Sequence, residues 1–374
     1  MMPPPERYSF LGLKESVSLT NLEIERSFWE QTTGVVLIVN KKVLIINTGG
    51  TLSSVAKEHG LTPGLTTDSM LRELHVVAGE AELITQEFSS LDSANIFPED
   101  WVRLAQAISQ QRDEYDGIVV IHGTDTLAYT SSMLSFMLQN IHIPVVITGS
   151  QLSISNPVAD AMENLRCAIF MAQSGCPGVF VAFNRKVMLG CRSSKVRSLS
   201  FDAFDSINCE NVAEISSIGM KINERMLPKR NGIFRLQDRY CPDVSVIKLF
   251  PGIRSEVLQM YVDHGCRAFF IEAFGLGGMP FLRHDFISGI SRLTEQGITV
   301  LVGTQCRFEG SSLEVYETGR RALEAGVLQA YDMTAEAAVT KLMWVLGQTQ
   351  DPVEIREYFQ LNLCGEVTIP QGKG

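Results

Sequence analysis

The sequence predicts an open, three-layer α/β fold that is divided into two domains. At about 150 residues per domain, a chain of 374 residues has room for two, each with its own core. Short β-branched runs recur, and each ends in a glycine or a small polar residue, as strands buried on both faces of a parallel sheet do. Segments with helical patterns lie between these runs, which is typical of a sheet covered by helices on both faces.

The expected strands are continuous apolar runs of four to seven residues. They are residues 43–47, 118–121, 145–148, 179–183, 244–250, 268–272 and 299–302.

The expected helices fill the intervals between most of these runs. They are residues 99–112, 127–139, 159–173, 255–264, 283–296, 335–346 and 353–361. Pro98 immediately before the first helix, and the sequence Asp351-Pro352-x-Glu354 at the last, are signals for a helix start.

One polar stretch, residues 227–243, contains two prolines and interrupts the alternation of strands and helices. We therefore expect a larger N-terminal domain over residues 43–226, a linker over 227–243 and a smaller C-terminal domain over 244–374. Residues 1–42 form an N-terminal extension whose role the sequence does not reveal.

Composition narrows the class of protein. The chain has 32 Lys and Arg against 42 Asp and Glu, a formal charge of −10, which argues against nucleic acid as a partner. Apolar residues make up 45% and charged residues 20%, as in ordinary globular proteins. The eight cysteines form no Cys-x-x-Cys pair, and the first thirty residues contain no signal-peptide core. We expect a reduced, cytoplasmic protein that does not enter a membrane.

Familiar metal and nucleotide motifs are missing from the sequence. The six histidines form no His-x-His or His-Glu-x-x-His pair, so we expect no metal. There is no phosphate-binding loop, no dinucleotide fingerprint and no Gly-x-Ser-x-Gly elbow. The sequence predicts a protein without a cofactor.

Two expected strands run into loops that are rich in glycine and threonine. Residues 43–47 lead into Thr48-Gly-Gly-Thr51, and residues 118–121 lead into His122-Gly-Thr-Asp-Thr126. In an open parallel sheet, ligands bind beyond the carboxyl ends of the strands, where both loops lie. Threonine and glycine also terminate strands and cap helices without any further role, and the residues alone leave both interpretations open.

A hydroxyl nucleophile needs a base, and a lysine next to a carboxylate can provide one. Lys195, in Cys191-Arg-Ser-Ser-Lys195, is the best candidate because it follows an expected strand in a small polar loop. On the residue pattern alone, a solvated surface charge is the favoured interpretation of Lys195.

Six motifs together resemble the L-asparaginases of the bacterial type. They are Thr48-Gly-Gly-Thr51, Asp92-Ser93 followed by Pro98-Glu-Asp-Trp101, His122-Gly-Thr-Asp-Thr126, Thr148-Gly-Ser-Gln151, Ser193-Ser-Lys195 and Asp332-Met-Thr334. The likeness runs from about residue 43 to 368. In showing no signal-peptide core, the sequence resembles the type I, cytoplasmic branch of the family. The resemblance implies the two-domain asparaginase-type fold, with mostly parallel sheets, and a homodimer or homotetramer.

The resemblance also implies a reaction, the hydrolysis of asparagine to aspartate and ammonia, with a weak glutaminase side activity. Thr51 would be the nucleophile that forms an acyl-enzyme. Thr124, Asp125 and Lys195 would form a second triad that activates the attacking group and then water. Asp125 would also hold the substrate ammonium, and Asp92 and Ser93 would bind the same end of the substrate.

Two departures from the family pattern bear on the chemistry and its regulation. Leu61 stands where many members carry a tyrosine in the loop that closes over the substrate, and leucine cannot relay a proton. Tyr316 matches a C-terminal tyrosine that some type I members use instead, although its own pattern favours a half-buried helix residue. Glu272 stands where some members have the arginine that binds an effector, so we expect no allostery of that kind.

Two alternatives remain beside an asparaginase. One is the D subunit of a tRNA-dependent glutamyl amidotransferase, which needs a partner subunit and a basic surface facing tRNA; the charge of −10 opposes it. The other is a non-catalytic amino-acid-binding homologue, which would require the loss of a triad residue. All of Thr51, Thr124, Asp125 and Lys195 are present.

Overall fold

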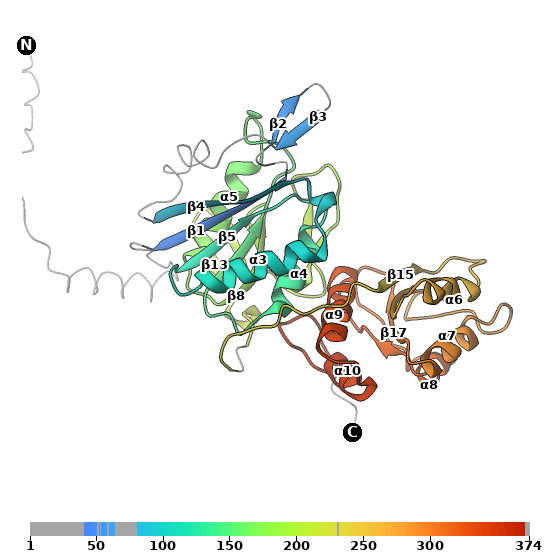
Figure 1. Ribbon diagram of the computed structural model, residues 1–374. Coiled ribbons are helices and arrows are strands. Elements are labelled where there is room, and N and C mark those ends of the chain that lie inside the picture. The colour runs from blue at the N-terminus through green and yellow to red at the C-terminus, as the bar shows by residue number, and fades with distance from the viewer. Residues whose placement is uncertain are drawn as a thin grey trace, which may run out of the picture. The chain divides into compact units, whose positions relative to one another are not determined.

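A computed structural model (Figure 1) describes residues 41–50, 52, 81–229 and 232–370, together with the backbone of the strands β2 (Ser54–Lys57) and β3 (Gly60–Pro63). Among these residues, two larger sheets carry the fold, one in each half of the chain.

The first sheet has eight strands within the described residues, in the order β13-β12-β9-β8-β7-β5-β1-β4. The strands β4, β1, β5, β7 and β8 run parallel, and β9, β12 and β13 add an antiparallel edge. Their bounds are β1 Lys42–Gly49, β4 Glu82–Leu91, β5 Gly117–Ile121, β7 Pro144–Thr148, β8 Gly178–Phe183, β9 Lys186–Leu189, β12 Ala213–Ser216 and β13 Gly219–Ile222.

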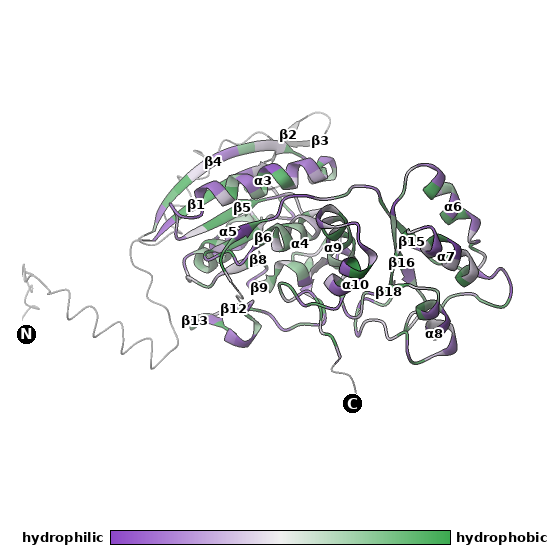
Figure 2. Ribbon diagram, turned by 60° about the horizontal axis from the view of Figure 1, so that its bottom comes forward, coloured by the Kyte–Doolittle hydropathy of each residue, from purple (hydrophilic) through white to green (hydrophobic). Residues whose placement is uncertain are grey.

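Helices cover both faces of this sheet. Alternate residues of β1 enter two different cores: Leu44 and Ile46 face α3 (Pro98–Gln111) and α4 (Leu127–Met137), whereas Val43 and Ile45 face α5 (Ala161–Ala172). Figure 2 shows the difference in hydropathy that accompanies their burial, since the buried α4 is mostly green and α3 carries both purple and green bands.

The second sheet has four parallel strands in the order β15-β16-β17-β18, namely Val244–Lys248, Ala268–Ala273, Thr299–Thr304 and Leu328–Gln329. One face packs against α6 (Glu256–Asp263), α7 (Phe286–Glu295) and α8 (Glu317–Glu324). The other face packs against α9 (Ala335–Gln348), which also contacts α4 of the first half. One hydrophobic core therefore runs from the first sheet through α4 and α9 to the second.

Short elements complete the described chain. They are β6 Leu138–Gln139, β10 Ser193–Lys195, β11 Phe204–Ser206, β14 Arg235–Leu236, α10 Pro352–Phe359 and the 3₁₀ turns η2 Ser93–Asn95, η3 Gly190–Arg192 and η4 Glu224–Met226.

The predicted two-domain α/β fold with mostly parallel sheets is confirmed, and so are both predicted helix starts. Pro98 occupies the first turn of α3, and the carboxylate of Asp351 accepts the Val353 N–H at 2.8 Å to cap α10. The sequence patterns did not predict β4 or α8. The edge strand β4 is polar and half exposed, and α8 buries only Gly319 and Ala322, so neither shows a continuous apolar pattern.

Candidate active site

The loop that follows β5 carries Thr124 and Asp125 to the carboxyl edge of the first sheet. Its start is anchored by His122, whose backbone N–H donates to the Thr148 carbonyl at 2.8 Å. The Thr124 side chain is buried with 7% of its surface exposed, and α4 begins three residues later at Leu127. The sheet edge thus presents the hydroxyl of Thr124 from a fixed backbone.

Lys195 reaches this loop from the short strand β10. Its Nζ lies 2.8 Å from Thr124 Oγ1 and 2.6 Å from Asp125 Oδ1. Only 20% of the lysine side chain is exposed, against 65% for Asp125. The favoured interpretation of Lys195 from its residue pattern alone, a solvated surface charge in a loop, is therefore wrong. The structure brings together the three residues that the resemblance grouped.

The buried side chain of His122, at the start of the same loop, is held by hydrogen bonds on both of its ring nitrogens. His122 is 1% exposed, its Nδ1 lies 2.7 Å from the Gly123 carbonyl, and its Nε2 lies 2.9 Å from Thr130 Oγ1. Trp101 donates its indole N–H to the same Thr130 oxygen at 2.9 Å. Burial lowers the pKa of His122 to about 4, partly opposed by its hydrogen bond to Gly123, so the ring is neutral at pH 7. These contacts are consistent with a proton on Nδ1 that holds the carbonyl just before Thr124.

Ser93 lies against the Thr124 loop from a different element. Its buried hydroxyl accepts the Asp125 backbone N–H at 3.2 Å, and its carbonyl accepts the Thr126 hydroxyl at 2.8 Å. Among the described residues no acceptor is recorded for the Ser93 hydroxyl hydrogen. The neighbouring Asp92 is exposed, and its Oδ1 accepts the Ala94 N–H at 3.0 Å. Ser93 is thus bonded to the Thr124 loop at two points.

The first motif loop touches the second. Gly50 has a φ of +84°, and a Cβ placed on it would lie 2.5 Å from the Cα of Gly123, so the two backbones are in direct contact. Thr51 itself lies outside the described residues. Leu61 belongs to β3, whose side chains also lie outside them.

Tyr316 lies in the second half of the chain, at the residue that precedes α8. Its side chain is 61% exposed, and its backbone is extended, so the interpretation as a half-buried helix residue is wrong. Within the described part of the chain, no hydrogen bond joins its hydroxyl to Thr124, Asp125 or Lys195.

Two residues that the sequence did not point to hold this cluster in place. Gln151 Oε1 lies 3.4 Å from Thr124 Oγ1, and the Gln151 amide donates to the carbonyls of Ser198 and Ser200 at 3.1 Å. From the second half of the chain, Arg307 donates to the Lys195 carbonyl at 3.2 Å. Gln151 ends one of the quoted motifs, but no sequence signal connects Arg307 to Lys195.

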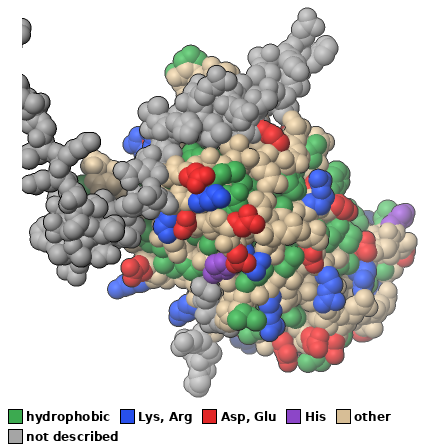
Figure 3. All heavy atoms as spheres, turned by 60° about the vertical axis from the view of Figure 1, so that its left-hand side comes forward, with side chains coloured by type: hydrophobic (Ala, Val, Ile, Leu, Met, Phe, Trp, Pro, Cys, Tyr) green, Lys and Arg blue, Asp and Glu red, His purple; other side chains and the backbone are tan. Residues whose placement is uncertain are grey.

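Among the described residues no group of three or more His, Cys, Asp or Glu side chains is arranged to hold a metal ion. In the same part of the chain, no helix combines the length and the apolar content needed to cross a membrane. On the part of the face in Figure 3 that is not drawn in grey, acidic and basic side chains are interspersed.

Comparison with known proteins identifies the family. Residues 42–228 match the family described as "Asparaginase, N-terminal", and residues 243–359 match "Glutaminase/Asparaginase C-terminal domain". An L-asparaginase of Thermococcus kodakarensis is 44% identical over 329 residues, which cover 87% of this chain and 99% of that protein. The chain belongs to the asparaginase family, whose members are hydrolases acting on amide bonds.

Two further similarities bear on the activity. A solved structure of the thermostable L-asparaginase from Thermococcus kodakarensis superposes with a TM-score of 0.82 at 43% identity, covering 88% of this chain and all of that one. The D subunit of the glutamyl-tRNA(Gln) amidotransferase of Pyrococcus horikoshii is 36% identical over 338 residues, covering 87% of this chain and 76% of that protein.

Proposed function

We propose that this protein is an L-asparaginase that hydrolyses asparagine to aspartate and ammonia, with glutamine as a weak second substrate. The observation that carries the proposal is the contact of Lys195 Nζ with both Thr124 Oγ1 and Asp125 Oδ1, in a chain of the asparaginase family. A lysine beside a threonine hydroxyl and a carboxylate is an arrangement that can move a proton to and from that hydroxyl.

Substrate binding is assigned to the groups around Asp125. Its Oδ2 takes no hydrogen bond from any described residue, so that oxygen can accept from the α-ammonium of asparagine. The Ser93 hydroxyl, with Asp92 beside it, binds the same end of the substrate and donates to the α-carboxylate. Holding both charged groups of the substrate places its side-chain amide over the first motif loop, and this positioning lowers the barrier.

The chemistry then follows in two steps. The Thr51 oxygen attacks the amide carbon, and the Thr51 proton passes through the Tyr316 hydroxyl to the amide nitrogen. The C–N bond then breaks, which leaves a β-aspartyl ester and releases ammonia. In the second step a water molecule attacks the ester carbon and its proton passes through Thr124 to Lys195. The ester C–O bond then breaks as that proton is returned to the Thr51 oxygen, which releases aspartate and restores the threonine. Backbone N–H groups of the glycine-rich loops stabilise the negative oxygen in both steps.

Beyond the site, the proposal covers the setting of the enzyme. We propose a cytoplasmic homodimer or homotetramer without a cofactor; the eight cysteines, none of which is in a disulfide, support a reducing compartment. We also propose the domain division 43–226 and 244–374, with the linker 227–243 and the extension 1–42. The two sheets and the two family ranges support this division.

The amidotransferase role is the second candidate, and the 36% identity to a D subunit of that enzyme favours it specifically. Ammonia release from free asparagine and free glutamine separates the two. We expect the purified chain alone to release ammonia from asparagine faster than from glutamine, and Thr51→Ala to lose this activity. Glutamine turnover that requires a second protein, with none of asparagine, would support the alternative instead.

A further inference from the structure

A buried ion pair lies away from the proposed active site. Lys341 on α9 and Glu366 are both 0% exposed, and their Nζ and Oε1 atoms are 2.6 Å apart. Burial by itself raises the pKa of Glu366. The charge of Lys341 and two backbone N–H groups outweigh burial and hold that pKa below its usual value. The proposed reaction makes no use of this ion pair.

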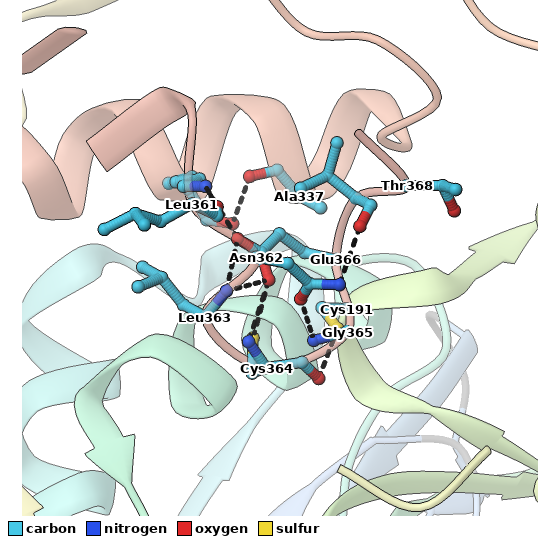
Figure 4. Close-up of polar contacts among 12 residues, drawn as sticks. Cys191, Ala337, Leu361, Asn362, Leu363, Cys364, Gly365, Glu366 and Thr368 are labelled. Atoms are coloured by element: carbon cyan, nitrogen blue, oxygen red, sulfur yellow. Dashed lines mark hydrogen bonds and ion pairs between the residues drawn. The ribbon is translucent and has the colours of Figure 1, made fainter. Parts of the chain in front are cut away.

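The ion pair closes a turn near the end of the described chain, residues 361–367, which we call the C-terminal turn. The Glu366 carboxylate accepts the backbone N–H groups of Leu363 at 2.9 Å and Cys364 at 2.8 Å, and Lys341 donates to the Leu361 carbonyl at 2.8 Å. Asn362 closes the turn further by donating to the Val367 carbonyl at 2.7 Å. In Figure 4 the Glu366 side chain points into this turn, toward the nitrogens of Leu363 and Cys364.

Arg192 connects the C-terminal turn to the element that carries Lys195. Its guanidinium is 2% exposed and donates through Nε to the Gly365 carbonyl at 2.7 Å and through Nη2 to Thr368 Oγ1 at 3.2 Å. Its Nη1 donates to the Asp332 carbonyl at 3.0 Å and lies 3.1 Å from Asp332 Oδ2. All three nitrogens of this side chain are therefore engaged by the second half of the chain.

Arg192 ends the turn η3, and β10 begins at the next residue and ends at Lys195. On its other side, this segment is held by α4, where the Ser131 hydroxyl donates to the Gly190 carbonyl at 2.8 Å. Ser194 adds a third attachment by donating to Glu336 Oε1 at 2.7 Å. The backbone that aims Lys195 at Thr124 is thus held between α4 and the C-terminal turn.

We propose that Arg192, held by Asp332 and by the C-terminal turn that Lys341 and Glu366 close, is a positioning residue that keeps Lys195 within reach of Thr124. The inference rests on the proposed function of Lys195. The C-terminal turn lies beyond residue 359, where the match to the family's C-terminal domain ends. A displacement of about 1 Å at a catalytic group can cost about 10²-fold in rate. Arg192 is buried and lies three residues before Lys195, so the loss of its contacts can shift the lysine far enough to slow the reaction.

The test compares Arg192→Met and Arg192→Lys with two controls. Arg321→Met removes an exposed arginine that binds Glu317 at 3.0 and 2.8 Å and lies over the Phe281 ring, away from Arg192 in the sequence. Leu293→Ala removes a buried apolar side chain of α7, which destabilises the fold at a residue outside the groups that hold Arg192. Steady-state ammonia release gives kcat and KM for asparagine. Hydrogen–deuterium exchange of a peptide that spans residues 190–197 reports the backbone of β10 independently of activity.

We expect Arg192→Met to lower kcat by at least about tenfold while KM changes less than about threefold, because the lysine moves and the binding groups stay. Exchange over residues 190–197 should speed up in the same variant. Arg192→Lys should fall between Met and the parent, since one ammonium cannot replace a planar fork. Both controls should retain the parental kcat and the parental exchange.

A second variant tests the ion pair itself. Lys341→Met with Glu366→Gln removes both charges together and keeps an acceptor for the two N–H groups, which avoids an unpaired buried charge. We expect faster exchange over residues 190–197 and a smaller drop in kcat than for Arg192→Met. An unchanged double variant would overturn the role given to the ion pair.

The outcomes separate this inference from the proposed function. A parent enzyme that releases ammonia, with Arg192→Met equal to it in kcat and in exchange, overturns the positioning role and leaves the function standing. A parent that releases no ammonia from asparagine overturns the function. In that case the exchange data alone test whether Arg192 holds the backbone of β10. Unchanged exchange in Arg192→Met refutes this role, and faster exchange supports it. A drop in kcat that Leu293→Ala shares equally shows general destabilisation and also refutes the positioning role.

Discussion

The Nζ atom of Lys195 lies 2.8 Å from the hydroxyl oxygen of Thr124, although 71 residues separate them in the chain. The contact exists because β5 and β10 end near each other and because the second half of the chain holds β10 through Ser194 and the Lys195 carbonyl. The same lysine is bonded to Asp125, so the three side chains form one connected group.

The hydroxyl of Tyr316 gives the cleanest test of the proton relay. No described residue bonds to this hydroxyl, and the side chain is 61% exposed, so Tyr316→Phe should not lower stability. We expect turnover to fall by about 10²–10⁴-fold, the usual effect of losing a general acid–base, with KM changed much less. Tyr261→Phe, at an exposed tyrosine of α6, is the matched control. Parental turnover in Tyr316→Phe would give the relay to another group.

Glu272 predicts simple saturation kinetics. Its carboxylate lies 4.0 Å from Lys248 Nζ, and only 19% of its side chain is exposed. Burial raises the pKa of the partly buried Tyr129, and the charges of Glu336 and Glu272 raise it further. An acidic residue there repels the carboxylate of an amino-acid effector, so the differential binding that cooperativity needs is missing. Initial rates against asparagine concentration should follow a hyperbola. A Hill coefficient clearly above one would contradict this and direct attention to Arg307.

His122 predicts a loss of stability in mild acid. Its pKa is about 4 in the folded protein because the ring is buried, whereas the unfolded chain takes up the proton near pH 6.5. The unfolded state therefore binds more protons below pH 6.5, and folding stability should decline from there to about pH 4, by about 3 kcal/mol in total. Urea unfolding at pH 7 and pH 4.5 measures this decline, and His122→Asn should remove most of it. Equal pH dependence in the two proteins would refute the assignment.

We expect the enzyme to tolerate a deletion within the N-terminal extension, residues 1–42. Family similarity begins at residue 42, and the archaeal L-asparaginase matches along 99% of its own length with 87% of this chain. Removing residues 1–33 should therefore leave kcat per site within about twofold of the parent. The measurement is ammonia release normalised to folded protein. Loss of both activity and solubility would make the extension part of the folded body.

Local patterns predicted the fold well because buried parallel strands need continuous apolar runs. β1, β5, β7 and β8 are such runs, and their ends present the glycine and threonine loops. β4 was not predicted because an edge strand tolerates polar residues on both faces. α8 was not predicted because a helix that buries two small residues has no apolar stripe.

The sequence predicted the fold more completely than it predicted the contacts within the site. Thr124 and Asp125 stand in a strand-end loop, and their place follows from sheet topology. The contact of Lys195 with them depends on tertiary packing between residues far apart in the chain, and its own neighbours resemble a surface loop. The hydrogen bonds of Arg192 connect it to residues 332 and 365, and no spacing rule in the sequence relates such positions.

The central claim is that Lys195 moves a proton at Thr124, and two substitutions measured together test it most directly. Lys195→Met removes the base, whereas Lys195→Arg keeps the positive charge beside Asp125 but cannot give up its proton. Lys248→Met, at a lysine with 66% of its side chain exposed, serves as the control. The account predicts that kcat for asparagine falls by at least about 10³-fold in both Lys195 variants and stays parental in the control. Turnover within about tenfold of the parent in Lys195→Arg would show that Lys195 supplies only charge and would contradict the account.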